Sequence, residues 1–274
     1  MSLQLQKKFS RLKSIIASYR SVLVAFSGGQ DSALLLKAAS LALPPGKVLA
    51  VTAVSATYPE GELVQAKNLA RRIGSRLKII RTGELKDKRF TVNSTRRCYF
   101  CKQELFSRLI AIAGKNGLEA VLEAGSLSDN SDYRPGSAAG RRLGVKSPLA
   151  EAGFFKQDIR RLSKKLGLSS WDKPSMACLA SRIPYGTGIT APLLKRVDRS
   201  ETYLRSLGLG QVRLRHYGDT CRIETDAKEI PRLLSKRRNI VRRLKKEGYH
   251  YITVDLEGYR TGSLNEAVKR LRRL

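Results

Sequence analysis

The segment with the clearest chemistry is the hexapeptide Ser27-Gly28-Gly29-Gln30-Asp31-Ser32. It lies between an apolar run typical of a strand and a pattern typical of a helix. Two adjacent glycines let the backbone turn tightly and approach a ligand, and the N–H groups at the start of a helix attract anions. The two serines add hydroxyl donors. The segment therefore favours pyrophosphate binding, although an ordinary strand–helix turn capped by Ser or Asp is the alternative. It is not a Walker loop, because that spacing and its lysine are missing.

Cys178 is a candidate nucleophile. It occurs in a stretch over 171–190 that is predicted to be an extended loop, and a long irregular stretch in a compact protein is usually either disordered or functional. Lys173 and Arg182 flank it, and their positive charges would favour the reactive thiolate. The alternative is a buried and inert cysteine, which is common for this residue type.

Two further cysteines, Cys98 and Cys101, have the spacing Cys-x-x-Cys. A lone pair of this kind is compatible with zinc, with a redox pair or with simple helix packing. Cys221 lies in a predicted strand and is expected to be structural. Four cysteines are too few for a secreted disulfide framework in 274 residues, so a reduced cytoplasmic compartment is expected.

Arg213 and Arg215 alternate on a predicted strand over 212–216, so their side chains are expected on one face. Planar guanidinium groups in this arrangement could hold the phosphate of a mononucleotide, and Arg182 could do the same. The alternative is that these are solvated surface charges in a basic chain.

The chain carries 53 Lys and Arg against 23 Asp and Glu, a formal net charge of +30. Such a charge favours polyanions, phosphorylated small molecules or acidic partners as ligands. A dense cationic run falls on two predicted helices near the C-terminus. A solvated helix face is the favoured interpretation of this run, and nucleic-acid binding is the sharper alternative. The run consists of Arg232, Lys236, Arg237, Arg238, Arg242, Arg243, Lys245 and Lys246.

The elements that position these residues follow from the apolar pattern. Strands alternate with helices in the first part of the chain, which predicts an α/β fold with a doubly wound parallel sheet. In such sheets ligands bind beyond the carboxyl ends of the strands, where the glycine turn lies. A smaller α+β domain is predicted to follow. The boundaries are 1–185 for the first domain and 186–274 for the second; the predicted strands are 22–26, 48–54, 77–80 and 120–123, then 212–216, 221–225 and 251–256, and the predicted helices are 3–16, 32–43, 60–73, 102–113, 156–166 and 191–207.

The apolar stretches are short. The longest clean one near the N-terminus, over 22–26, is far too short for a signal sequence or a membrane span. A soluble cytoplasmic protein that does not bind membranes is therefore expected.

The hexapeptide resembles the PP-loop of the ATP pyrophosphatases, which cleave ATP between its α and β phosphates. Other segments are similar to LarE-type sulfur transferases across nearly the whole chain. These segments are Arg97-Cys98-Tyr99-Phe100-Cys101-Lys102, Asp132-Tyr133-Arg134-Pro135-Gly136, Ser147-Pro148-Leu149, Trp171-Asp172-Lys173-Pro174, Cys178-Leu179-Ala180-Ser181-Arg182-Ile183-Pro184-Tyr185-Gly186 and Leu256-Glu257-Gly258-Tyr259-Arg260.

The resemblance implies a fold like that of the adenine nucleotide alpha-hydrolases and an ATP-dependent sulfur transferase of nickel-pincer nucleotide synthesis. Such enzymes adenylylate a pyridinium carboxylate mononucleotide and convert it to a thiocarboxylate. Carried onto this chain, the resemblance implies that Cys178 is catalytic and that substrate phosphate is bound by Arg182, Arg213 and Arg215. It implies ATP contacts from Ala25, Ser27, Gly28, Gly29, Asp31, Ser32 and Gly125.

The family also implies cofactors and partners. ATP with Mg²⁺ is expected, and the protein is expected to form a homo-oligomer. Sulfur comes either from Cys178 itself, which becomes dehydroalanine, or from a 4Fe-4S cluster held by Cys98, Cys101 and Cys178. Two alternatives stay open: a PP-loop enzyme that thiolates tRNA, and a non-enzymatic nucleic-acid-binding protein.

Overall fold

The protein is described by a computed structural model covering residues 2–59, 61–128, 135–174 and 177–265. Residues 132–134 of the LarE-like segments and residue 60 of a predicted helix lie outside this range. The chain divides into two compact units. Unit 1 comprises residues 1–55, 60–90 and 95–176, and unit 2 comprises 56–59, 91–94 and 177–274. The predicted domain boundary at residue 185 stays a prediction.

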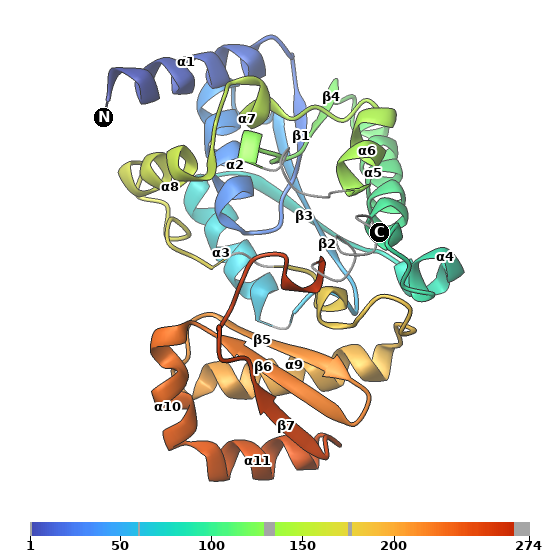
Figure 1. The fold of residues 1–274 in the computed structure, drawn as a ribbon. Coiled ribbons are helices and arrows are strands. Elements are labelled where there is room, and N and C mark those ends of the chain that lie inside the picture. The colour runs from blue at the N-terminus through green and yellow to red at the C-terminus, as the bar shows by residue number, and fades with distance from the viewer. Residues whose placement is uncertain (1, 60, 129–134, 175–176, 266–274) are drawn as a thin grey trace, which may run out of the picture. The chain divides into compact units, whose positions relative to one another are not determined.

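Unit 1 is built on a parallel four-stranded sheet, as the alternating pattern predicted (Figure 1). The strand order is β3-β2-β1-β4. Because β1 lies between β2 and β4, the residues that follow it emerge at the middle of the carboxyl edge. The strands are β1 (Val22–Ala25), β2 (Val48–Val54), β3 (Arg76–Arg81) and β4 (Ala120–Leu122).

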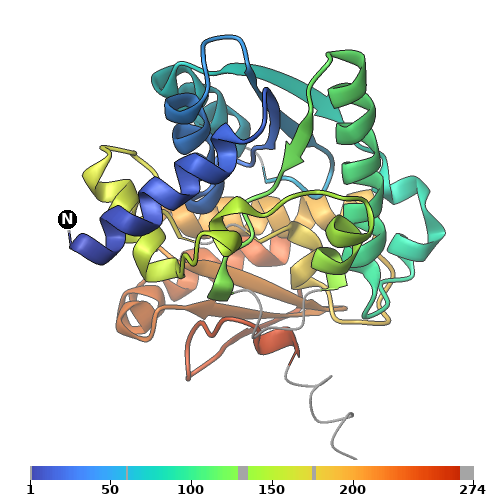
Figure 2. The same ribbon diagram turned by 90° about the horizontal axis from the view of Figure 1, so that it is seen from above.

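Helices cover both faces of this sheet. Successive strand residues point to opposite faces, and because both sets are apolar here, each face is buried under helices. Val22 and Val24 pack with residues of α1, α2 and α3 on one face, whereas Leu23 packs with residues of α5 on the other. Figures 1 and 2 show these helices on the two faces of the sheet. The sheet therefore has two separate apolar cores. The helices are α1 (Leu3–Ala17), α2 (Gln30–Ala42), α3 (Glu62–Ile73), α4 (Lys88–Thr91), α5 (Arg97–Lys115), α6 (Pro135–Arg142), α7 (Pro148–Glu151) and α8 (Lys156–Lys165).

Two differences from the sequence prediction concern α5 and α6. Helix α5 begins at Arg97 rather than at residue 102, so the Cys-x-x-Cys pair lies in its first turns. Helix α6 forms in a segment whose Ser, Gly and Pro content indicates a loop. The glycines have another function here: a Cβ at Gly136 would lie 2.9 Å from Lys102 Cγ, and one at Gly140 would lie 3.1 Å from Phe106 Cε2. Small residues thus allow α6 to pack closely on α5.

Unit 2 contains a three-stranded sheet of order β5-β6-β7, in which β5 and β6 are antiparallel and β7 is parallel to β6. This agrees with the predicted α+β character. The described residues of the predicted loop over 171–190 include a short 3-10 turn, η3 (Leu179–Arg182). None of the helices in the described ranges is long and apolar enough to cross a membrane. The elements are α9 (Ala191–Ser206), β5 (Val212–Tyr217), β6 (Thr220–Thr225), α10 (Ile230–Ser235), α11 (Arg237–Lys246) and β7 (Tyr251–Val254).

Candidate active site

The backbone of the hexapeptide 27–32, called the PP-loop below after its resemblance, requires glycine at one position in particular. Gly28 has φ +74°, in the left-handed region that side chains disfavour. A Cβ at this residue would also lie 2.8 Å from Cβ and 3.0 Å from Cα of Ala66 on α3. The turn from β1 into α2 therefore passes so close to α3 that no other residue fits without movement.

Two serines brace this turn across its base. Ser27 Oγ and Ser32 Oγ are 3.1 Å apart, Ser27 N–H donates to Ser32 Oγ at 3.3 Å, and Ser32 Oγ donates to Gly29 O at 3.1 Å. Ser27 is exposed whereas Ser32 is buried. Gly29 caps the start of α2, where the first N–H groups of a helix have no acceptor within the helix. The loop thus presents a hydroxyl group and a helix start at the edge of the sheet.

Asp31, in the first turn of α2, forms an ion pair with Lys156 at the start of α8. The backbone N–H of Lys156 donates to Ser128 Oγ at 3.1 Å. The loop after β4, the start of α8 and the PP-loop helix are thereby joined. Lys156 places a positive charge beside the PP-loop, and no sequence pattern marks it, because it is one lysine among many in a basic chain.

The segment 171–174 is tied to both helices that flank the PP-loop. The Gln30 side-chain amide donates to Trp171 O, and Lys173 forms an ion pair with Glu62 on α3. The prediction assigned the charge of Lys173 to the thiolate of Cys178, but in the structure its amine is paired with this carboxylate. Gln30 therefore connects the start of α2 to the segment 171–174.

Ala25 and Gly125 lie at neighbouring strand ends. Ala25 is the last residue of β1, and Gly125 follows β4, which pairs with β1 in parallel. A Cβ at Gly125 would meet Glu123 Oε1 at 3.1 Å, and Glu123 accepts a hydrogen bond from Ser147 Oγ, also at 3.1 Å. Both predicted ATP contacts therefore belong to the sheet edge that carries the PP-loop.

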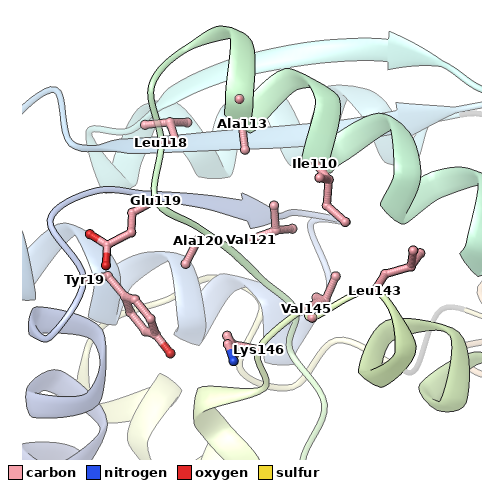
Figure 3. A pocket seen from close by; sticks show the side chains of 12 residues that line it. Tyr19, Ile110, Ala113, Leu118, Glu119, Ala120, Val121, Leu143, Val145 and Lys146 are labelled. Carbon is pink, nitrogen blue, oxygen red and sulfur yellow. The ribbon is translucent and has the colours of Figure 1, made fainter.

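A separate hollow of about 360 Å³ lies where β4 begins (Figure 3). Tyr19 and Glu119 line one part of it, and Ile110, Leu143 and Val145 line another. Tyr19 precedes β1 whereas the PP-loop follows it. The hollow therefore lies at the opposite edge of the sheet from the PP-loop.

Cys178 in unit 2 is exposed and directly precedes η3. The loop that carries it is held by Arg182, which donates to the carbonyl oxygens of Ala177 at 2.8 Å and Cys178 at 3.1 Å. Cys178 is therefore not buried, as the alternative required, whereas Cys221 on β6 is fully buried. Burial raises the pKa of the Cys221 thiol to about 12, which agrees with a structural role.

Arg182 is itself buried, with only 2% of its surface exposed, and it pairs with fully buried Glu201 on α9. Two parallel hydrogen bonds of 2.8 and 2.9 Å join the guanidinium to the carboxylate. Burial alone would lower the pKa of Arg182, but the negative charge of Glu201 more than offsets this effect and raises it. Burial would likewise raise the pKa of Glu201, and Arg182 lowers it instead. Both shifts favour the ionised pair, and the two parallel hydrogen bonds fix its geometry.

Arg213 and Arg215 are both buried rather than solvated, so that alternative is wrong for them. Arg215 donates to Ser181 O at 2.7 Å and to Glu224 Oε2 at 2.7 Å. Arg213 lies over the Tyr259 ring, 5.4 Å from its centroid. Burial and, next, the charge of Arg182 lower the pKa of Arg213 to about 10. The three predicted arginines thus form one buried cluster around the Cys178 loop.

Sequence reasoning missed the carboxylates of this cluster, Glu201 and Glu224. A signal was present for Glu201, which shares the apolar stripe of α9 with Leu194, Val197 and Leu204. An acidic residue on a core-facing stripe needs a buried cationic partner. The signal for Glu224 was weaker. Its cross-strand partner is Arg213, an opposite charge, but this could be recognised only if the predicted pairing of the two strands was assumed.

Cys98 and Cys101 lie three residues apart at the start of α5, so they are neighbours on the helix surface. Cys98 is exposed and Cys101 is partly buried. Within the described ranges, no group of three or more His, Cys, Asp or Glu residues is placed to hold a metal ion. The 4Fe-4S cluster stays a prediction.

Comparison with known proteins adds an independent line of evidence. The chain is 39% identical over 268 residues to an uncharacterised protein of Synechocystis sp., covering 97% of this chain and 100% of that protein. It is 38% identical over 266 residues to pyridinium-3,5-bisthiocarboxylic acid mononucleotide synthase of Lactiplantibacillus plantarum, covering 97% of this chain and 96% of that enzyme. An uncharacterised protein of Methanocaldococcus jannaschii is 26% identical over 258 residues, covering 93% of this chain and 98% of its own. No family model matches the chain.

Proposed function

Because the chain belongs to the LarE-type family that includes pyridinium-3,5-bisthiocarboxylic acid mononucleotide synthase, we propose that it exchanges carboxylate oxygen for sulfur on a pyridinium mononucleotide. The product of the reaction is a thiocarboxylate. The whole-chain similarity to that synthase carries the proposal, and it favours a mononucleotide over tRNA as the substrate. The observed PP-loop and the buried arginine cluster support it.

The reaction needs activation first, since a carboxylate is a poor electrophile and its oxygen is a poor leaving group. In the proposed first step, a substrate carboxylate oxygen attacks the α-phosphorus of ATP. The bond to the β-phosphate breaks and pyrophosphate leaves, which yields an acyl adenylate. This intermediate lets AMP depart when sulfur attacks the acyl carbon.

The PP-loop is assigned to the ATP phosphates. Gly28 and Gly29 allow the backbone to approach the phosphates, and Ser27 offers an exposed hydroxyl donor. The helix start at Gly29 and the ammonium group of Lys156 add positive potential where pyrophosphate accumulates charge. Gly125 and Ala25, at the neighbouring strand ends, are assigned to the rest of the nucleotide.

Cys178 is assigned as the sulfur nucleophile, because it is exposed and held by Arg182 through its own carbonyl. Its thiolate attacks the acyl carbon, AMP leaves and a thioester forms. If Cys178 is the donor, loss of its Cα proton then breaks its Cβ–S bond. That step releases the thiocarboxylate and leaves dehydroalanine, so each chain turns over once.

The arginine cluster is assigned to the substrate phosphate. Arg213 is supported most strongly, since burial and the neighbouring Arg182 lower its pKa and an anion beside it would offset both effects. Arg215 shares its face of β5. Arg182 has hydrogen bonds to Glu201, Ala177, Cys178 and Ser181, so its phosphate role is proposed as secondary to holding the loop.

Mg²⁺ and a 4Fe-4S cluster fit this chain to different degrees. Asp31 supplies the one carboxylate of the hexapeptide and is an oxygen donor of the kind that Mg²⁺ takes, although it is paired with Lys156. When bound with ATP, Mg²⁺ would spread the charge of the leaving pyrophosphate. Cys98 and Cys101 supply two thiolates, and no three-ligand group is assembled within the described parts of the chain. No step is assigned to a cluster.

Product analysis tests the proposal. The purified protein is incubated with ATP, Mg²⁺ and pyridinium-dicarboxylate mononucleotide, and the products are identified by liquid chromatography and mass spectrometry. We expect AMP, pyrophosphate and a nucleotide heavier by the difference between sulfur and oxygen. ADP as the nucleotide product, or no gain of sulfur with Cys178 intact and ATP consumed, would overturn the proposal.

A further inference from the structure

The cationic run of unit 2 lies outside the site described above. Between residues 230 and 246 the sequence has eight Lys and Arg residues and no Asp or Glu. In the structure this run forms α10, α11 and the turn between them. Most of its cations are exposed and only Arg243 has an ion-pair partner in the described chain. We define the basic surface as the other seven residues, Arg232, Lys236, Arg237, Arg238, Arg242, Lys245 and Lys246.

Three of the cations on α11 share one face. Ile240 and Leu244 are buried and fix the inner side of the helix. Arg238, Arg242 and Lys245 follow one another at spacings of four and three residues, which places them in a single stripe on the outer side. A hollow of about 410 Å³ adjoins α11 at its start, lined by Ser235, Lys236, Arg237, Arg238 and Asn239.

No carboxylate of the described chain neutralises the basic surface. The nearest acids along the sequence are Glu229 and Glu247, and both are engaged elsewhere. Glu229 accepts from the Gly210 N–H at 3.0 Å, and Glu247 pairs with Arg199 at 2.8 Å and Arg243 at 2.9 Å. The positive charge on the exposed side of α11 therefore faces solvent.

This arrangement works against the stability of the free helix. Like charges four residues apart, such as Arg238 and Arg242, repel each other. Arg237 and Arg238 also lie in the first turn of α11, where the helix dipole favours anions, and that turn has no acidic residue. A bound polyanion would remove both penalties at once.

We propose that the basic surface binds the phosphate backbone of nucleic acid, a partner beyond the mononucleotide chemistry of the proposed function. Counterion release makes a row of unpaired cations an effective ligand for a regular array of phosphates. The same surface of a second copy is a poor partner for this surface, because it is equally basic. Insertion into a membrane is disfavoured because Ile240 and Leu244, two of the three large apolar residues of α11, are already buried.

The test compares two variants with the same charge. One carries Arg238→Gln, Arg242→Gln, Lys245→Gln and Lys246→Gln on α11. The control carries Lys67→Gln, Arg71→Gln, Arg72→Gln and Lys78→Gln, four exposed cations of α3 and β3 in unit 1. Each variant lowers the net charge by four. Binding of a labelled DNA duplex of about 20 base pairs is measured by fluorescence anisotropy over a series of salt concentrations.

We expect the α11 variant to bind the duplex at least about ten-fold more weakly than wild type, with a salt slope lower by about 0.9 for each lost phosphate contact. The control should bind nearly as wild type.

Equal losses in both variants would show that only net charge matters, and this would overturn the proposal. It would also be overturned if wild type bound no duplex near physiological salt, or if vesicles of phosphatidylglycerol and phosphatidylcholine bound in preference to the duplex. Product formation from the mononucleotide should be unchanged in the α11 variant, so this test and the test of the proposed function fail separately.

Discussion

Replacing Gly28 by alanine tests the tight turn of the PP-loop. A non-glycine residue at φ +74° costs about 1 kcal/mol. The new Cβ would also lie 2.8 Å from Ala66 Cβ and 3.0 Å from its Cα, and relieving such an overlap costs about 2 kcal/mol. The two costs total about 3 kcal/mol. If only the loop rearranges to relieve them, the binding conformation of the loop is destabilised by this amount, and nucleotide affinity falls roughly a hundred-fold.

Isothermal titration calorimetry with ATP and Mg²⁺ measures this loss, and thermal unfolding shows whether the variant folds. Gly46→Ala is the matched control, because Gly46 has φ +85° with no atom within 4 Å of the added Cβ. It should lose about 1 kcal/mol of stability and no nucleotide affinity. Adding Ala66→Gly to Gly28→Ala removes the closest overlap but not the strain in φ, so part of the affinity should return. Wild-type affinity in Gly28→Ala would refute the assignment of this turn to the phosphates.

Three further predictions concern unit 2. Cys178→Ser should still release pyrophosphate but form no thiocarboxylate, as measured by product mass spectrometry; sulfur transfer by this variant would exclude Cys178 as the nucleophile. Glu201→Gln leaves the buried Arg182 guanidinium uncompensated and should lower the free energy of unfolding by about 3 kcal/mol in chemical denaturation, whereas a loss below about 1 kcal/mol would contradict the buried ion pair. Burial and the nearby charge of Arg196 lower the pKa of His216 from 6.5. As the pH falls, His216 is therefore protonated in the unfolded chain before it is protonated in the folded one, and the free energy of unfolding should decrease below pH 6.5. His216→Gln should flatten this pH dependence of the unfolding temperature and exposed His250→Gln should not, so equal effects would argue against the assignment.

The sequence predicted the architecture of unit 1 because buried parallel strands and amphipathic helices leave strong periodic patterns. It also located the PP-loop, since the two glycines occur between a strand and a helix. Helix α6 was not predicted, because the glycines at 136 and 140 that permit its packing on α5 are the same residue type that breaks helices elsewhere.

The candidate site was predictable only in part, for a physical reason. Residue type and spacing identify Arg182, Arg213 and Arg215 as cations, but burial decides whether they are solvated or paired. Burial depends on contacts between residues distant in sequence, such as Glu201 with Arg182, and no local pattern encodes them. The contact of Lys156 with Asp31 is equally non-local and was missed for the same reason.

The central claim is that ATP activates a substrate carboxylate by transferring its adenylyl group. Substrate labelled with heavy oxygen in the carboxylate tests this directly, because the labelled oxygen must leave with AMP when sulfur replaces it. Mass spectrometry of the released nucleotide should find the label in AMP in step with thiocarboxylate formation. Unlabelled AMP alongside a sulfur-containing product, or label in inorganic phosphate, would contradict the mechanism.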